Sequence, residues 1–296
     1  MIGLLLMLGF AVPQNSQETL SRCIERKDSG CVASLLRESP PNPSPEYLAL
    51  AARGYMLLQR NEEALKSIDR ALELKPGDHG LLMERGWLCQ RSGDQPAAIQ
   101  SFLLAAKGRP DSPEVLYELG MSFFFAHEYD RAAKHFTHVL ELDPRNDRAD
   151  FMLGIVAIWR DQLTEAESWF KKAIELKPKS ADYLLHYGVL LAKLEQNELA
   201  VANIREAERI DDSNPLIHLN LGKLYRLSGN LPGAKTELEA ALRLRSNLSS
   251  AAYQLAGVYR QLGDQARARE TLALFQKLNA QEKNEPEDPI DDAVSH

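Results

Sequence analysis

The segment VLYELGMSFFFAHEYDRAAKHFTHVLELDP, residues 115–144, contains the pattern that decides the fold. Apolar residues recur at intervals of three and four in two runs separated by a turn-like piece, which predicts two antiparallel helices. The small residue Gly120 lets the two backbones approach closely, and Phe136 fills the space beside it. Pro144 ends the second helix because proline has no N–H for the next helical hydrogen bond.

The same pattern recurs along the chain every 34 residues. Proline or a polar substitute closes each unit, an alanine recurs in the second helix, and a small residue lies twelve positions before that alanine. The prolines are Pro76, Pro110, Pro144 and Pro178; the alanines are Ala64, Ala98, Ala132, Ala166, Ala200, Ala234 and Ala268; the small residues are Ala52, Gly86, Gly120, Gly154, Gly188, Gly222 and Ala256. A fixed period of this length indicates a stack of similar units, each packed on its neighbours.

This pattern resembles the tetratricopeptide repeat family over about four-fifths of the chain. In the third unit the resemblance is carried by Leu119, Gly120, Phe123, Tyr129, Ala132, Phe136 and Pro144. It implies an all-α fold, an α-solenoid in which antiparallel helix pairs form a right-handed superhelix and the first helix of each pair lines the inner surface. We expect seven repeats within residues 45–280, at 45–78, 79–112, 113–146, 147–180, 181–214, 215–248 and 249–280.

The start of the chain indicates export. Residues 1–12 are largely apolar, with Gly9 and Ala11 placed like the small residues before a signal-peptidase cut, although no basic residue precedes the run. The run is too short to cross a bilayer, so we expect a signal peptide, no membrane span in the mature chain, and a periplasmic or secreted protein. A wrongly assigned start site in a cytoplasmic protein is the alternative.

Residues 13–44 hold two short helical runs, which we expect to cap the first repeat. Cys23 and Cys31 lie on either side of the turn-like KDSG, so their Cβ atoms could meet. In an exported chain these cysteines are predicted to form a disulfide, and in a cytosolic chain to stay free thiols.

The charge is concentrated at the end of the chain. Residues 281–296 hold six acidic residues and one lysine, which accounts for −5 of the formal net charge of −7. We expect this tail to be disordered. The remaining body is nearly neutral and has no broad basic face, so nucleic acid is not expected as a partner.

The register predicts which residues line the inner surface. In the third and fourth units these are mostly large and apolar, and in the fifth to seventh they include basic residues, whereas Phe123 falls at a core position. If a third of each large side chain were exposed, the apolar patch would measure on the order of 500 Å². The predicted partner-binding residues are Tyr117, Met121, Phe124, Phe125, Phe151, Met152, Ile155, Ile158, Trp159, Leu185, Val189, Lys193, Lys223, Arg226 and Arg260.

These observations predict a non-enzymatic scaffold that binds a protein or peptide with apolar and acidic portions, in an envelope or secretion-related assembly. The segments outside the repeats are too short for a catalytic domain. His127, His135 and His138 complete no ligand set, and no glycine-rich phosphate loop is present, so we expect no metal and no cofactor. The alternatives are a homo-oligomer whose groove is filled by self-association, a cytoplasmic adaptor, and a groove occupied by the chain's own acidic tail.

Overall fold

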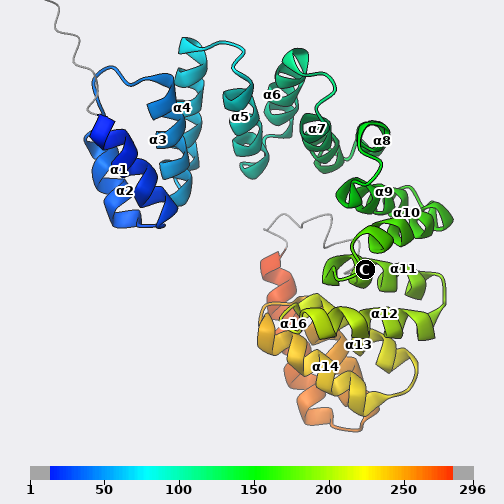
Figure 1. The fold of residues 1–296 in the computed structure, drawn as a ribbon. Coiled ribbons are helices and arrows are strands. Elements are labelled where there is room, and N and C mark those ends of the chain that lie inside the picture. Colours follow the sequence, from blue (N-terminus) through cyan, green and yellow to red (C-terminus); the bar gives the residue numbers. More distant parts are fainter. Residues whose placement is uncertain (1–13, 283–296) are drawn as a thin grey trace, which may run out of the picture. The chain divides into compact units, whose positions relative to one another are not determined.

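The computed structural model describes residues 14–282, and the regular structure of this part is helical throughout (Figure 1). The prediction of an all-α solenoid built from helix pairs is confirmed. The helices are α1 Gln14–Glu25, α2 Ser29–Arg37, α3 Pro45–Leu57, α4 Asn61–Leu74, α5 His79–Arg91, α6 Gln95–Gly108, α7 Pro113–Phe125, α8 Tyr129–Leu142, α9 Asp147–Trp159, α10 Leu163–Leu176, α11 Ala181–Lys193, α12 Asn197–Ile210, α13 Pro215–Leu227, α14 Leu231–Leu244, α15 Ser249–Gln261 and α16 Gln265–Glu282.

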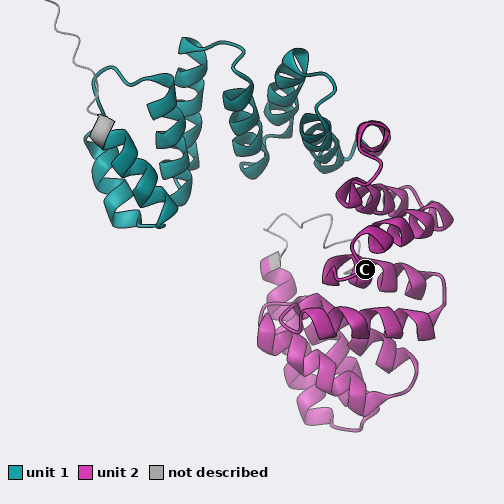
Figure 2. Ribbon diagram, in the orientation of Figure 1, with its two compact units in different colours: residues 1–128 teal, residues 129–296 magenta. Residues whose placement is uncertain are grey.

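The chain divides into two compact units, residues 1–128 and 129–296 (Figure 2). The boundary lies within the third repeat, between α7 and α8. In the first unit α3 pairs with α4 and α5 with α6; in the second unit the pairs are α9 with α10, α11 with α12, α13 with α14, and α15 with α16. Each second helix also contacts the next first helix within its unit, so the helices of each unit form an unbroken series of contacts.

Local sequence explains where the helices begin and turn. Ser44 and Ser112 accept hydrogen bonds from backbone N–H groups in the first turns of α3 and α7, and proline follows each of them at the first helical position. The turn inside each pair places one residue in the left-handed region, at φ between 57° and 82°. These residues are Gln59, Gly93, His127, Asp161, Glu195, Gly229 and Gly263.

The recurrent small residues allow the two helices of a pair to touch. A Cβ atom on Gly154 would lie 2.6 Å from the ring of Phe170, and one on Gly222 would lie 2.5 Å from Leu238. Both distances are shorter than van der Waals contact, so the larger side chain of the second helix packs directly on the glycine backbone. These contacts confirm the role predicted for the small residue in the repeats that contain Gly154 and Gly222.

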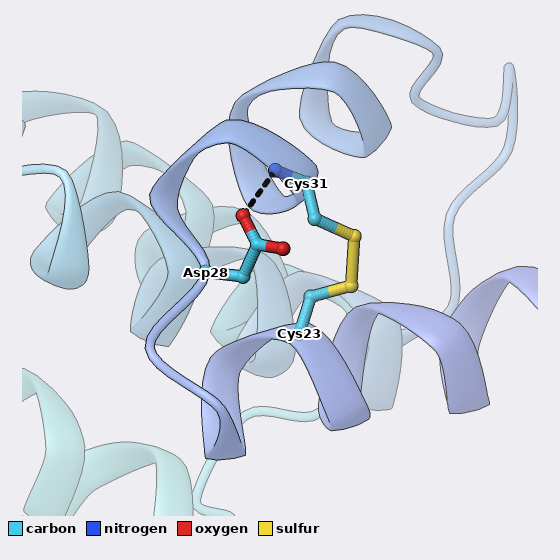
Figure 3. Close-up of a disulfide and its surroundings, with 3 residues drawn as sticks. All are labelled: Cys23, Asp28 and Cys31. Atoms are coloured by element: carbon cyan, nitrogen blue, oxygen red, sulfur yellow. Dashed lines mark hydrogen bonds between the residues drawn. A yellow bond between two sulfur atoms is a disulfide. The ribbon is translucent and has the colours of Figure 1, made fainter.

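Two helices precede the first repeat. Both α1 and α2 contact α3, and Leu20, Val32 and Leu36 form a core with Tyr47 of α3. Cys23 and Cys31 form a disulfide between α1 and α2, with an S–S distance of 2.00 Å (Figure 3). Asp28 begins α2 by accepting a 2.9 Å hydrogen bond from the backbone N–H of Cys31 (Figure 3).

The predicted signal peptide and nearly all of the acidic tail lie outside the described residues. Among the helices that the structure describes, none is both long and apolar enough to cross a membrane.

Candidate functional site

The predicted partner-binding residues of the first unit lie on α7. Tyr117, Met121 and Phe125 are half-buried, so part of each side chain reaches the surface. Phe124 is fully buried and its ring lies edge-on to that of Phe125, with 5.7 Å between the centroids. The expectation that Phe124 is exposed is therefore wrong, whereas the predicted burial of Phe123 is confirmed.

Most of the apolar residues predicted on the inner surface of the second unit are buried as well. Phe151 is 8% exposed, and Met152, Ile155, Leu185 and Val189 are also buried. The condition set above for an apolar patch of about 500 Å², that a third of each side chain is exposed, is not met by these five residues.

Contacts between consecutive first helices explain this burial. The Phe151 ring on α9 stacks on Tyr183 of α11, with 4.6 Å between the centroids, and meets His186 edge-on at 5.0 Å. Large side chains on neighbouring first helices therefore cover one another. Ile158 and Trp159 stay half-buried at the end of α9, where the Trp159 ring stacks on Tyr129 of α8.

The basic residues of the second unit keep more exposure. We call Lys193 of α11, Lys223 and Arg226 of α13, and Arg260 of α15 the basic strip. Lys193 and Arg260 are exposed, and Lys223 and Arg226 are half-buried. Burial, together with repulsion from Lys193, lowers the pKa of Lys223 to about 8. The α13 helix contacts both α11 and α15, so the strip follows three neighbouring first helices.

Two polar atoms beside this strip have no hydrogen-bond partner among the described residues. They are Nε of Arg226 and Oε1 of Gln254, and both atoms are buried. The Arg226 side chain lies over α15, with Nη1 3.2 Å from the place where a Cβ on Gly257 would stand. A buried donor without an acceptor costs about 1–3 kcal/mol.

Two exposed apolar residues lie on the same helices as the strip. Leu227, next to Arg226 on α13, is 71% exposed, and Tyr253 on α15 is 54% exposed. Sequence reasoning missed Tyr253, although it shares its repeat position with Phe151 and Leu185. The described residues contain no first helix beyond α15 that could stack on Tyr253 as Tyr183 stacks on Phe151. The Tyr253 ring contacts that of Phe275 on α16, with 5.1 Å between the centroids, and the side chain stays exposed.

Sequence reasoning also missed a cluster of polar residues in the core of the second unit. His218 on α13 lies between Glu208 on α12 and Glu237 on α14. A hydrogen bond to Glu237 raises the pKa of His218. The signal in the sequence was the repeat position of His218. Other repeats have leucine at this position, namely Leu82, Leu116 and Leu184.

Comparison with known proteins gives the following matches. A sequence model of the tetratricopeptide repeat matches residues 49–113, 117–181 and 217–282. The BBSome complex member BBS4 of Bos taurus is 27% identical over 191 residues, which cover 64% of this chain and 36% of BBS4. The type IV pilus assembly protein PilF of Pseudomonas aeruginosa is 27% identical over 190 residues, which cover 63% of this chain and 73% of PilF.

A crystal structure of a tetratricopeptide repeat protein from Parabacteroides merdae superposes with a TM-score of 0.66 and 16% identity. The match covers 84% of this chain and 97% of that protein. The agreement in fold thus extends beyond the segments that the sequence model matches.

Proposed function

Because this chain belongs to the tetratricopeptide repeat family, we propose that it is a non-enzymatic scaffold that binds a protein segment on the first helices of its second unit. In this proposal the bound protein segment places a carboxylate against the basic strip. The observation that carries the proposal is the row of four cations on three neighbouring first helices, in which Lys193 and Arg260 are exposed and Lys223 and Arg226 are half-buried. A carboxylate would pair with these cations and reduce the repulsion between Lys193 and Lys223.

The apolar part of the ligand contacts the side chains that remain accessible. In the second unit these are Ile158, Trp159, Leu227 and Tyr253. The buried residues Phe124, Phe151, Met152, Ile155, Leu185 and Val189 contribute by holding the first helices together rather than by touching the ligand. In the first unit Tyr117, Met121 and Phe125 offer a separate contact area on α7.

The compartment we propose is the periplasm or the cell exterior, in an envelope or secretion-related assembly. The Cys23–Cys31 disulfide supports it because disulfides persist in oxidising compartments. The match to PilF, whose name places that protein in pilus assembly, supports it as well. The alternative is a cytoplasmic adaptor, and the mass of the chain isolated from its host separates the two, because only an exported chain would lack residues 1–12.

A paired substitution tests the proposed site. Arg226→Gln with Arg260→Gln removes two charges from the basic strip, and Arg243→Gln with Arg245→Gln removes two charges from exposed positions at the end of α14 and just after it. Proteins retained from host extract by the unaltered chain should be lost from the first variant and kept by the second, with a larger difference at low salt. Equal retention by both variants would show that the basic strip does not bind the partner.

Self-association is the competing use of the same surface. A second copy could place its acidic tail or its exposed Leu227 and Tyr253 against the strip. Sedimentation of the pure protein over a range of concentrations distinguishes the two. A monomer at every concentration supports a foreign ligand, and a dimer that dissociates in the Arg226→Gln, Arg260→Gln variant supports self-association.

A further inference from the structure

Three potential ligand atoms meet in the core of the second unit, away from the basic strip. Nδ1 of His218 lies 2.9 Å from Oε2 of Glu237 and 3.7 Å from Oε1 of Glu208. All three atoms lie within 4.8 Å of one another. His218 and Glu237 are 8% and 7% exposed, and Glu208 is partly exposed, so the group is enclosed on most sides.

The hydrogen bond made by Nε2 of His218 determines where the ring carries its proton, and therefore whether Nδ1 presents a lone pair to the carboxylates. Nε2 lies 3.0 Å from the backbone carbonyl oxygen of Asp212, and a carbonyl oxygen can only accept. Nε2 therefore carries a proton, and Nδ1 can bind either a second proton or a metal ion. Histidines that bind metals usually donate their other N–H to a carbonyl or a carboxylate in this way.

Arg205 of α12 holds the two carboxylates in the matching orientation. Its Nη1 donates to Oε2 of Glu208 at 2.5 Å, and its Nη2 lies 3.2 Å from Oε1 of Glu237. These are the oxygens that do not face His218. Nε of Arg205 donates to the Tyr225 hydroxyl at 2.8 Å, which fixes the guanidinium. One oxygen of each carboxylate is thus occupied, and the other points toward Nδ1.

We propose that Oε1 of Glu208, Nδ1 of His218 and Oε2 of Glu237 bind a divalent transition-metal ion, with Zn²⁺ as the best fit. In a tetrahedral zinc site with bonds of 2.0–2.1 Å, neighbouring ligand atoms are roughly 3.3 Å apart. The two distances from Nδ1, 2.9 and 3.7 Å, lie on either side of that value, and the two carboxylate oxygens lie within 4.8 Å of each other. One imidazole with two carboxylates favours zinc, cobalt or nickel over magnesium and calcium, which prefer shells made entirely of oxygen.

The same place can be filled by a proton, and the two occupants exclude each other. A His218 ring protonated on both nitrogens would donate a hydrogen bond to Glu237. Its positive charge and that of the Arg205 guanidinium would together balance the two carboxylates. The metal ion replaces that proton on Nδ1. Since Arg205 already neutralises one carboxylate charge, we expect weaker binding than in a structural zinc site made of thiolates.

A bound ion would join three consecutive helices. Glu208 comes from α12, His218 from α13 and Glu237 from α14, so the ion would cross-link the second helix of one repeat to both helices of the next. Binding to the folded chain alone stabilises it, so the midpoint of thermal unfolding should rise with the metal concentration.

The test uses the full chain, freed of metal with a chelator and then titrated with Zn²⁺ by calorimetry and with Co²⁺ by absorption spectroscopy. The unaltered chain should bind one equivalent of Zn²⁺ and show the visible bands of four-coordinate Co²⁺. His218→Gln should lose the bands and weaken Zn²⁺ binding at least tenfold. His138→Gln, a half-buried histidine on α8, should behave like the unaltered chain.

Glu208→Gln keeps the test decisive if His218→Gln fails to fold, because Glu208 is the most exposed of the three ligands. Zn²⁺ should raise the unfolding midpoint of the unaltered chain, a chelator should reverse the rise, and Glu208→Gln should show little of it. The proposal is overturned if the unaltered chain binds no Zn²⁺, or if Glu208→Gln binds Zn²⁺ and responds to it as strongly as the unaltered chain does.

Discussion

Replacing Asp150 with asparagine should make the protein more stable at neutral pH. Asp150 on α9 is 3% exposed, and no hydrogen bond to its carboxylate contributes to its pKa. The positions 34 residues before and after it hold Leu116 and Leu184, so a charge stands where neighbouring repeats place an apolar side chain. Burial raises the pKa of Asp150 to about 6, with Asp147 adding to the rise and Lys172 opposing it.

The size of the effect follows from the difference between the two pKa values. The unfolded chain has a pKa of 3.8 at this residue and the folded chain about 6, a difference of about 2.2 units. At 1.36 kcal/mol per unit, the charged carboxylate lowers the free energy of unfolding by ~3 kcal/mol at pH 7. Asparagine keeps the shape of the side chain and carries no charge, so Asp150→Asn should recover most of that free energy.

The sign of the pH dependence distinguishes this explanation from a simple packing effect. Between pH ~4 and ~6 the folded chain holds the proton more tightly than the unfolded chain, so this group makes stability fall as pH rises. Above pH ~6 both states are ionised and the loss is constant. The advantage of Asp150→Asn should therefore be full at pH 7 and nearly absent at pH 4.

Urea unfolding at several pH values measures this difference. In a Trp87→Phe background, which removes the tryptophan of the first unit, the fluorescence of Trp159 and Trp169 reports on the second unit, in which Asp150 lies. Asp182→Asn, an exposed carboxylate on α11, is the control and should change stability little at any pH. An Asp150→Asn variant that is no more stable at pH 7, or whose advantage does not depend on pH, would refute the reasoning.

Three further substitutions test the packing. Gly154→Ala should cost ~1–3 kcal/mol in urea unfolding, because the added methyl group would collide with the Phe170 ring. Phe124→Ala should cost ~3–5 kcal/mol, because the ring is fully buried. Replacing both Cys23 and Cys31 with serine should lower the free energy of unfolding of the first unit by ~2–3 kcal/mol, because the cross-link closes a short loop of the unfolded chain.

Matched controls accompany these three predictions. Gly108→Ala, at the end of α6 where a Cβ would contact nothing within 4 Å, should leave stability unchanged or raise it. Phe125→Ala, at a half-buried position, should cost less than Phe124→Ala, and an equal cost would contradict the distinction between the two rings. The serine substitutions should leave the unfolding of the second unit unchanged when it is followed by Trp159 and Trp169 fluorescence in the Trp87→Phe background.

Much of the fold could be predicted from the sequence because its signals are local. The helices, their turns and the pairing within a repeat depend on residues that lie a few positions to about 30 positions apart, such as Gly154 and Phe170. Because the pattern repeats every 34 residues, each repeat can be compared with the others. Asp150 and His218 then stand out as polar residues at a position where other repeats have leucine.

The candidate sites could be predicted only in part. The basic strip follows from the register alone, because long charged side chains reach solvent from a helix surface whatever lies beside them. The exposure of Phe124 and Phe151 does not follow from the register, because it depends on which side chains pack against each ring. Tyr183 and His186 cover Phe151, and both come from the next repeat.

The sequence by itself determined the helix pairs, the period and the close approach at each glycine, since these depend on backbone geometry and on the nearest neighbours in the chain. Only the tertiary structure decided which inner residues remain accessible, and only it brought Glu208, His218 and Glu237 from three helices to one point. The physical reason is that the burial of a side chain, and its contacts with distant residues, depend on how consecutive helices stack. Every repeat has the same positions, but the side chains that surround a given position differ from one repeat to the next.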